Sequence, residues 1–412
     1  MRKTELLIPA GSLDVLKTAV VYGADAVYIG GEAFGLRAKA HNFSNEEMKQ
    51  GIAFAHARGV KVYVTANILA HNGDLPGVEA YFEEMRDVAP DALIISDPGV
   101  FAIARRILPD MEIHISTQAN NTNYGTYLFW HGLGARRVVS ARELSLAEIR
   151  EIRDRIPQDM QIESFIHGAM CISYSGRCLL SNYFVGRDAN QGACTHPCRW
   201  KYSIVEETRP GEYMPVYENE RGTYIFNSKD LCMIGHIPEM MDAGIDSFKI
   251  EGRMKTALYV ATVARTYRKA IDDYKKDPQL YRDHMEWYRQ EIGKCTYREF
   301  TTGFYFGKPT EDAQIYDNNT YVKNYAYLGT VLEVDGRGRC LIQQKNKFCV
   351  GDTIEVMKPD GRNLELTVAG MEDEEGNAQD SAPHPKQVLW IDLGMDADLE
   401  VYDILRKKEE SA

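Results

Sequence analysis

The sequence lacks a long hydrophobic run and a leader-like start. No segment holds about 18 uninterrupted apolar residues, and the opening MRKTELLIPAGSLDVLKTAV has two basic residues but no apolar stretch ending in a small-residue cleavage site. Internal repeats of fixed period and long low-complexity tracts are also missing. We therefore expect a cytoplasmic protein without a membrane segment, with one large domain and a smaller one in its 412 residues.

Several catalytic signatures are absent as well. The chain contains no H-E-x-x-H and no G-x-S-x-G, so neither a zincin nor a nucleophile-elbow hydrolase is indicated. None of its cysteine spacings is C-x2-C, the tight knuckle that structural zinc sites favour. Arg199 and Trp200 follow Cys198 where a radical-SAM motif would require C-x2-C. These absences remove the commonest zinc and radical-SAM interpretations.

Positive charge is scarce overall but unevenly placed. The net charge of −12 disfavours indiscriminate binding to polyphosphate. However, residues 171–202 carry Arg177, Arg187, Arg199 and Lys201 against the single Asp188. A second basic stretch, residues 249–269, reads as the solvated face of a helix. Only the first stretch therefore suggests a local binding surface.

Cysteines are concentrated in one part of the chain. Residues 171–198 contain four of them, spaced C-x6-C-x15-C-x3-C, and Cys232 follows in NSKDLCMIG. Gathered thiolates in a reducing compartment favour an iron–sulfur cluster, with zinc and non-ligand cysteines as alternatives. A cysteine nucleophile paired with His167 or His196 is a further alternative. Cys295, Cys340 and Cys349 are scattered and read as buried small hydrophobic residues.

Short apolar runs alternate with amphipathic helical stretches along the first two thirds of the chain. This alternation predicts an α/β fold, a TIM-type (β/α)8 barrel, with an open doubly wound sheet as the main alternative. Ser44 with Glu47 and Ser145 with Glu148 form capping boxes that start two of the helices. The eight predicted strands are LLIPA, DAVYIG, KVYVTAN, ALIISD, EIHIST, RRVVSA, QIESFIHG and DSFKIEG.

The cysteine segment interrupts this alternation between the seventh and eighth strands. We expect a barrel over residues 1–276, with a cysteine-rich insertion at about 168–245. A Tyr- and Arg-rich connector covers 277–320, and alternating strands in 321–412 predict a small C-terminal all-β barrel. Since chemistry in such barrels lies at the carboxyl ends of the strands, the insertion falls beside the expected site.

Polar residues also follow the predicted strands. Each alone is an ordinary helix cap or loop hydrogen bonder, but as a ring around one mouth they suggest a polar pocket. The members of this ring are Ser12, Arg37, Asn67, Asp97, Thr117, Gln118, Asn120, Arg142, Glu143, His167, Glu251 and Arg253.

Four strings make the sequence familiar: LLIPAGSLDVLKTAVVYGADAVYIGG, ESFIHGAMCISYSGRCLLSNYFVGRDANQGACTHPCRW, FNSKDLC and FKIEGRMK. Over nearly its whole length the chain resembles the collagenase-like peptidase family U32, including the β domain of its longer members. The resemblance implies oxygen-independent hydroxylation of tRNA, ribosomal RNA or ubiquinone precursors by a 4Fe-4S protein. For the two-domain form it implies 5-hydroxyuridine at the tRNA wobble position, with prephenate as the hydroxyl donor. The alternatives are a U32-type peptidase and a non-catalytic cluster protein.

The resemblance also implies roles for individual residues. The cluster ligands carry over to Cys171, Cys178, Cys194 and Cys232, with Cys198 as an alternative ligand. Tyr174, Tyr183, Phe184 and Trp200 would offer stacking faces to an unpaired anticodon base. The expected partners are tRNA and a small dicarboxylate, and a partner subunit of the same family is compatible with the resemblance. Candidate catalytic residues are His167, Glu251 and Arg253, and candidate substrate-binding residues are Arg37, Asn67, Gln118, Asn120, Arg142, Arg187 and Arg199.

Overall fold

The computed structural model describes residues 4–35, 42–171, 173–200, 203–205, 213–215, 228–309, 313 and 321–409. The chain divides into two compact units. The first comprises Met1–Leu16, Asp25–Met254 and Arg298–Thr320, and the second comprises Lys17–Ala24, Lys255–Tyr297 and Tyr321–Ala412. The domain boundaries expected at residues 276 and 320 stay predictions.

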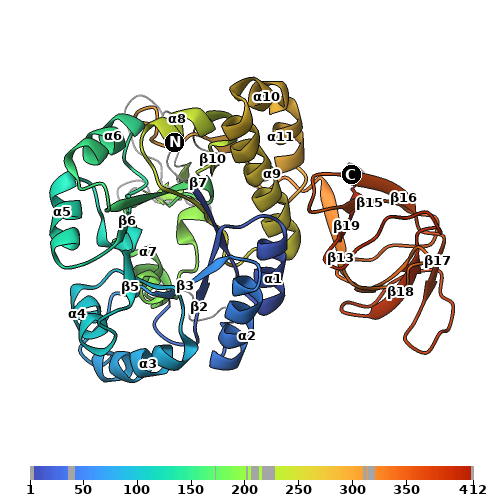
Figure 1. The fold of residues 1–412 in the computed structure, drawn as a ribbon, viewed down its shortest axis with the longest axis horizontal. Coiled ribbons are helices and arrows are strands. Elements are labelled where there is room, and N and C mark those ends of the chain that lie inside the picture. Colours follow the sequence, from blue (N-terminus) through green and yellow to red (C-terminus); the bar gives the residue numbers. More distant parts are fainter. Residues whose placement is uncertain are drawn as a thin grey trace. The chain divides into compact units, whose positions relative to one another are not determined.

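Eight parallel strands close into a barrel in the first unit, which confirms the predicted (β/α)8 fold (Figure 1). Neighbouring strands pair in chain order, and Ser247 of the last barrel strand pairs with both Glu5 and Glu163, which closes the ring. The strands are almost wholly buried, as expected for parallel strands rich in Val, Ile and Leu. They are β1 (Glu5–Pro9), β2 (Ala26–Gly30), β3 (Lys61–Ala66), β4 (Ala92–Ile95), β5 (Glu112–Ile115), β6 (Arg137–Val139), β7 (Gln161–Gly168) and β11 (Ser247–Ile250).

Helices alternate with these strands along the chain. Both predicted capping boxes are present: the Ser44 and Ser145 hydroxyls accept from the backbone N–H of Glu47 and Glu148, whose carboxylates accept from the capping residues in return. No helix within the described residues has the length and apolar character needed to cross a membrane. The helices are α1 (Leu13–Val21), α2 (Asn45–His56), α3 (Leu75–Val88), α4 (Pro98–Ile107), α5 (Tyr124–Gly132), α6 (Leu146–Arg155), α8 (Ile237–Asp242) and α9 (Ala257–Lys276).

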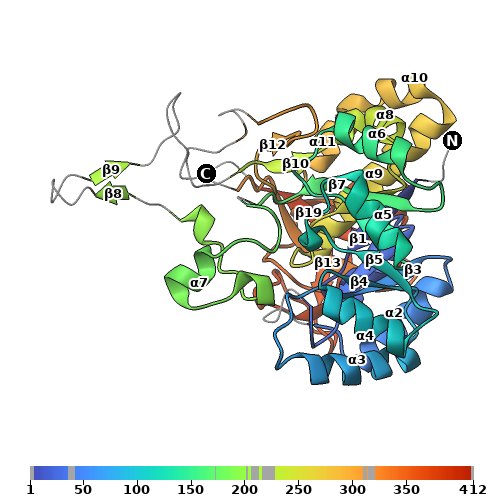
Figure 2. The ribbon, with the colours of Figure 1, turned by 90° about the vertical axis from the view of Figure 1, so that its left-hand side faces the viewer.

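The predicted insertion lies between β7 and β11, and Figure 2 shows its helix α7 projecting to one side of the barrel. Its end returns to β7, because β10 pairs antiparallel with that strand: Leu231 lies opposite Gly168, and Cys232 lies opposite His167. A buried ion pair, in which Arg298 Nε donates to Asp230 Oδ1 at 3.0 Å, fixes β10. The inserted elements are α7 (Leu180–Val185), β8 (Ser203–Val205), β9 (Tyr213–Pro215), β10 (Asp230–Cys232) and the 3-10 turns η2 (Ala189–Gln191), η3 (Pro197–Arg199) and η4 (Ile234–His236), and β12 (Phe300–Thr301) later pairs with β10.

Charged side chains fill part of the barrel interior. Arg137 Nη1 lies 2.6 Å from Glu5 Oε1 and 3.0 Å from Glu163 Oε2, and Lys249 Nζ lies 2.7 Å from Glu163 Oε1. Burial raises the pKa of Glu5, but Arg137 and the Tyr63 hydroxyl outweigh it and hold that pKa at about 2. Lys249 is therefore a buried strand residue, and its assignment to a solvated helix face was wrong.

The second unit contains the predicted all-β domain, a seven-stranded antiparallel sheet in the order β16-β15-β19-β13-β14-β18-β17. Its apolar face buries residues such as Leu328, Ile342 and Phe348. The last strand was not predicted because its sequence, ILRKK, is mostly basic. The elements are α10 (Pro278–Asp283), α11 (Met285–Ile292), β13 (Tyr325–Val334), β14 (Arg339–Gln343), β15 (Thr353–Met357), β16 (Asn363–Thr367), β17 (Gly370–Glu372), β18 (Val388–Asp392) and β19 (Ile404–Lys408).

Candidate functional site

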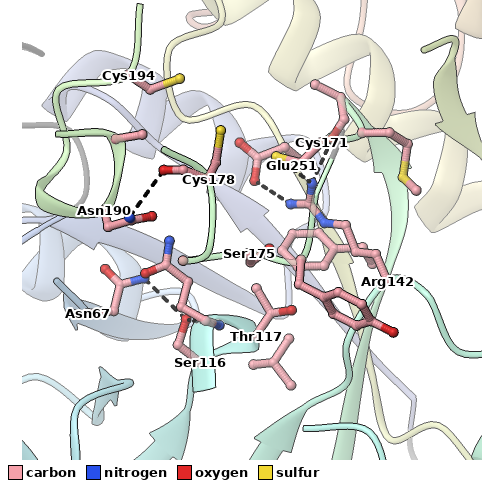
Figure 3. A pocket seen from close by; sticks show the side chains of 18 of the residues that line it. Asn67, Ser116, Thr117, Arg142, Cys171, Ser175, Cys178, Asn190, Cys194 and Glu251 are labelled. Carbon is pink, nitrogen blue, oxygen red and sulfur yellow. Dashed lines mark hydrogen bonds and ion pairs between the residues drawn. The ribbon is translucent and has the colours of Figure 1, made fainter. Parts of the chain in front are cut away.

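A pocket of about 220 Å³ opens at the carboxyl ends of the barrel strands. Tyr28, Thr65, Phe165 and Lys249 line it from the strands, and the segment that follows β7 closes it from one side. This is the end of the barrel at which (β/α)8 enzymes carry their active sites. Figure 3 shows the pocket with its cysteines above the strand ends.

Four of the five clustered cysteines line this pocket: Cys171, Cys178, Cys194 and Cys198. All are free thiols. Cys232 is not among the lining residues but lies at the same end of the barrel, in β10 beside the end of β7. Four of the cysteines thus lie at the barrel mouth, where the position of the insertion between the seventh and eighth strands predicted them.

Hydrogen bonds from the loop after β5 hold the cysteine segment over the mouth, and a further hydrogen bond stabilises the segment from within. Asn120 Nδ2 donates to the Ser175 carbonyl at 2.8 Å, and Arg177 Nε donates to Asn120 Oδ1 at 2.6 Å. Asn190 Nδ2 donates to the Cys178 carbonyl at 3.2 Å. Asn120 is thus an anchor of the segment, and it is not among the residues that line the pocket. The sequence reasoning missed Asn190, which stabilises the segment and also lines the pocket.

The thiols lie among hydrogen-bond donors. The backbone N–H of His196 donates to Cys194 Sγ at 3.4 Å, the Ser181 hydroxyl lies 3.9 Å from the same sulfur, and Arg142 Nη1 lies 4.0 Å from Cys171 Sγ. Such donors stabilise thiolates and are a typical second shell of sulfur-ligated metal centres. Among the described residues, however, no three His, Cys, Asp or Glu side chains are close enough together to hold a single metal ion. Thiolates are the ligands that soft metals prefer, so the cysteine sulfurs are the atoms through which this pocket would hold such a centre.

Arg142 is a buried cation at the mouth with several partners. Its Nη2 lies 3.2 Å from Glu251 Oε2, its Nη1 donates to the Ala169 carbonyl at 2.8 Å, and its guanidinium stacks 4.0 Å above the Phe165 ring. Burial lowers the pKa of Arg142, but Cys171 and Glu251 outweigh this and raise the pKa above its ordinary value. The guanidinium therefore stays charged beside the thiol and the carboxylate.

Two further cations reach the pocket from β11 and the residues after it. Arg253 is buried, and its Nη1 donates to Thr65 Oγ1 at 3.0 Å while its Nη2 donates to Asn42 Oδ1 at 3.3 Å. Its guanidinium occupies the space beside Gly30, where a Cβ would lie 2.1 Å from Nη1. Lys249 lies 4.5 Å from the centre of the Tyr28 ring. The pocket therefore combines three buried cations with aromatic walls and one acidic side chain, Glu251.

The structure brings some of the predicted residues together and places others elsewhere. Asn67, Gln118, Arg142, Glu251 and Arg253 line the pocket. His167 does not line it; its ring is buried in β7 and packs 5.6 Å from the Phe300 ring. Arg187 is exposed on the insertion, Arg199 lies in η3 without a described side chain, and Arg37 lies outside the described residues. The roles of these residues stay predictions.

An exposed group of apolar side chains lies on the insertion beside the cysteines. Tyr183 is 83% exposed, and Leu179, Phe184 and Trp200 are also exposed. The Tyr183 and Phe184 ring centres are 5.3 Å apart, and those of Phe184 and Trp200 are 6.3 Å apart. We call these three aromatic residues, together with Leu179, the aromatic ridge. Exposed aromatic groups of this kind usually mark an interaction surface.

The fold and the pocket define a (β/α)8-barrel protein with clustered thiols and buried cations at the catalytic end of its barrel. The chain belongs to peptidase family U32: the family matches residues 11–315, and the Peptidase family U32 C-terminal domain matches residues 323–406.

Named relatives cover most of the chain. It is 44% identical over 393 residues to the tRNA hydroxylation protein P1 of Bacillus subtilis (strain 168), which covers 95% of this chain and 92% of that protein. It is 39% identical over 446 residues to the tRNA hydroxylation protein P of Escherichia coli (strain K12), with 98% and 97% covered. A 23S rRNA 5-hydroxycytidine synthase of the same strain is 36% identical over 272 residues, which cover 66% of this chain and 39% of that protein.

Proposed function

We propose that this protein is an RNA-modifying enzyme of family U32 that hydroxylates a tRNA uridine. Two relatives named for tRNA hydroxylation match it over more than nine tenths of both chains. A third, named for making 5-hydroxycytidine, shares only the stretch that corresponds to about two thirds of this chain. Hydroxylation of RNA is therefore the activity that these names have in common.

In detail, we propose an oxygen-independent reaction in the cytoplasm that converts C5–H of the wobble uridine to C5–OH, with prephenate as the source of the hydroxyl group. The new C–O bond at C5 forms as the C–OH bond of prephenate breaks, and the C5 hydrogen and two electrons pass to the remainder of the donor, which is thereby reduced. The observation that carries the proposal is the gathering of four thiols and three cations around one pocket. A 4Fe-4S cluster would be held by Cys171, Cys178 and Cys194 with either Cys232 or Cys198. When bound, such a cluster supplies redox or Lewis-acid chemistry.

The cations have a separate role in this proposal. Guanidinium groups bind carboxylates through paired hydrogen bonds, so Arg142 and Arg253 would bind and orient the two carboxylates of the donor, with Lys249 adding positive charge beneath them. Glu251 holds Arg142 in place through the 3.2 Å ion pair. The Phe165 and Tyr28 rings would keep water away from the bound donor.

The aromatic ridge would bind the RNA. Single-stranded bases stack on exposed aromatic rings with little dependence on sequence, and a nearby cation such as Arg187 pairs with the phosphates. The ridge lies on the same segment as the pocket-lining cysteines, so an anticodon loop bound there would lie close to the pocket. Local binding of this kind is compatible with a net charge of −12.

The test is nucleoside mass spectrometry of tRNA from cells with and without the gene, in a strain that has no second enzyme of this family. We expect 5-hydroxyuridine and its derivatives to disappear with the gene and to return with the wild-type chain. Anaerobically purified protein should then modify unmodified tRNA in a prephenate-dependent reaction. An unchanged nucleoside profile would overturn the proposal.

A peptidase is the second candidate, because the family carries that name and His196 lines the pocket together with the cysteines. Incubation of the anaerobic protein with gelatin tests it, with Cys171→Ala and His196→Ala as comparison variants. Cleavage that both changes abolish would support the peptidase. Cleavage that is indifferent to both would identify a contaminant.

A further inference from the structure

Two amide side chains in the pocket have a buried oxygen without a hydrogen-bond partner among the residues that the structure describes. They are Asn67, directly after β3, and Gln118, in the 3-10 turn η1 (Thr117–Ala119) after β5. Buried polar atoms are nearly always paired in folded proteins, so unpaired atoms that line a pocket indicate a ligand that completes them. Because its Nδ2 is held by Ser116, Asn67 presents an acceptor, and the ligand group that completes Asn67 Oδ1 is a hydrogen-bond donor. Within the described residues, the Gln118 amide has no such partner and can turn either its oxygen or its nitrogen towards a ligand.

The need for a hydrogen-bond donor distinguishes the part of the pocket lined by Asn67 and Gln118 from the part lined by Arg142 and Arg253. Prephenate has a single hydroxyl group, which is consumed in the proposed transfer, and the two carboxylates that Arg142 and Arg253 would bind offer no hydrogen-bond donor to Asn67. A uracil base does offer one, the N3–H of its imide, flanked by two carbonyl oxygens. An amide side chain can accept from N3–H and donate to the adjacent O4, as asparagine and glutamine do with other bases.

The two amides differ in how firmly they are oriented. Asn67 Nδ2 donates to Ser116 Oγ at 3.2 Å, which turns Asn67 Oδ1 away from Ser116 (Figure 3). Ser116 Oγ also accepts from the backbone N–H of Gln118 at 3.4 Å, which leaves the serine in place as an acceptor. The Gln118 side chain forms no hydrogen bond within the part of the chain that the structure describes. Asn67 therefore presents a fixed acceptor, whereas the Gln118 amide is free to rotate.

We propose that Asn67 and Gln118 read the Watson–Crick edge of the target base, and that Asn67, oriented by Ser116, selects uracil over cytosine. Asn67 Oδ1 accepts from N3–H, which cytosine lacks, since its unprotonated N3 is itself an acceptor. Gln118 pairs with the 4-substituent and can rotate to suit a carbonyl or an amino group. This inference rests on the proposed function, because it assumes that a pyrimidine enters the pocket.

The test uses anticodon stem–loop RNAs that differ only at the wobble base: uridine, cytidine or N3-methyluridine. Hydroxylation of each is measured with anaerobically purified protein. The wild-type chain should prefer uridine over N3-methyluridine by about ten-fold or more. Asn67→Leu should reduce that preference to near unity, and Ser116→Ala should increase the use of cytidine relative to uridine.

Thermal unfolding supplies a second measurement, which a purely structural role would move in the opposite direction. Gln118→Met replaces an unpaired polar group by an apolar one of similar shape, so the melting temperature should stay or rise while the preference for uridine over N3-methyluridine falls. Gln50→Met, an exposed substitution on α2, is the matched control and should change neither.

The outcomes separate the inference from the function on which it rests. Equal hydroxylation of uridine and N3-methyluridine by the wild-type chain would overturn the inference and leave the proposed function standing. A drop in melting temperature for Gln118→Met with unchanged base preference would also overturn it. Failure to hydroxylate any of the three RNAs, with the cluster loaded and prephenate present, would instead overturn the proposed function.

Discussion

Arg142 and Glu251 form an ion pair at the barrel mouth, with Nη2 and Oε2 3.2 Å apart, although they follow strands on different parts of the ring. The same guanidinium reaches towards Cys171 Sγ at 4.0 Å. One buried cation thus connects the polar half of the pocket to the thiol half. Several measurable consequences depend on this arrangement.

Loss of the Arg142 guanidinium should affect both stability and cluster content. Arg142→Gln removes the buried ion pair with Glu251, so we expect the free energy of unfolding to fall by about 2 kcal/mol. Iron and sulfide content after anaerobic purification should fall as well, since the charge beside Cys171 is lost. The double variant Arg142→Gln/Glu251→Gln should recover part of the stability but not the activity. Full activity in Arg142→Gln would contradict the role given to it.

The cysteines should differ in their effect on bound iron. Cys171→Ser, Cys178→Ser and Cys194→Ser should each reduce the iron and sulfide count to a small fraction of the wild-type value. Of Cys198→Ser and Cys232→Ser, only one should do so, which would identify the fourth ligand.

Cys349→Ser, in the second unit, is the control for this series and should retain the wild-type iron content. A wild-type count in Cys171→Ser would rule out the proposed ligand set. Electron paramagnetic resonance of the reduced protein provides an independent measure of the same loss.

Substitution of Gly30 should weaken donor binding as much as substitution of Arg253, which lies beside it. A Cβ at this position would lie 2.1 Å from Arg253 Nη1, so Gly30→Ala should displace the guanidinium. We expect the prephenate concentration needed for half-maximal hydroxylation to rise at least ten-fold, as in Arg253→Lys, which loses the paired hydrogen bonds. Gly73→Ala, where a Cβ meets nothing within 4 Å, should leave that concentration unchanged. An unchanged value in Gly30→Ala would argue against donor binding by Arg253.

The aromatic ridge should contribute to RNA affinity and little to stability. Tyr183 is 83% exposed, so Tyr183→Ala should leave the melting temperature within error while weakening binding of an anticodon stem–loop by about ten-fold. Arg187→Glu should weaken binding further and reduce its dependence on salt concentration. Phe129→Ala, an exposed aromatic on α5, is the matched control. Equal losses in Tyr183→Ala and Phe129→Ala would indicate that the ridge has no special role.

The acidic pH limit of stability should depend on Glu5. The pKa of Glu5 is about 2 in the folded protein, whereas the ordinary pKa of a glutamate side chain, as in the unfolded chain, is 4.5. The folded chain therefore favours the charged form. The resulting stabilisation, about 3 kcal/mol, is complete above pH 4.5 and is lost as the pH falls towards 2. Glu5→Gln should therefore lower stability at pH 7 and flatten the pH dependence between 4.5 and 2. Denaturant unfolding across that range measures both, and Glu46→Gln, at the exposed start of α2, should change neither.

The barrel was predictable because its strands are continuous apolar runs and its helices carry local start signals such as Ser44 with Glu47. These signals depend on neighbours in sequence. The strand β19 was not predictable in the same way. Arg406 is fully buried, and its charge is compensated by Glu291 and by Glu355, whose Oε1 accepts from Arg406 Nε at 2.6 Å. A buried basic residue looks like a surface residue until its partner is known.

The site was predictable in its location and only partly in its membership. Strand-end position correctly brought Asn67, Gln118, Arg142, Glu251 and Arg253 to one pocket. It could not distinguish them from Asn120, whose side chain turns to the cysteine segment, or from His167, whose ring packs on Phe300. Side-chain direction at a strand end depends on local twist and irregular pairing, and β7 has such an irregularity where it pairs with β11.

The pairing of Gly168 with Leu231 means that the insertion leaves the barrel and returns to it at almost the same point. The inserted segment can therefore change in length or in sequence without altering the strand pairing of the eight-stranded barrel. Grafting this segment from one relative onto the barrel of another would transfer its surface as a unit. Changes in the insertion would thus alter which RNA is bound while the pocket at the barrel mouth stays the same.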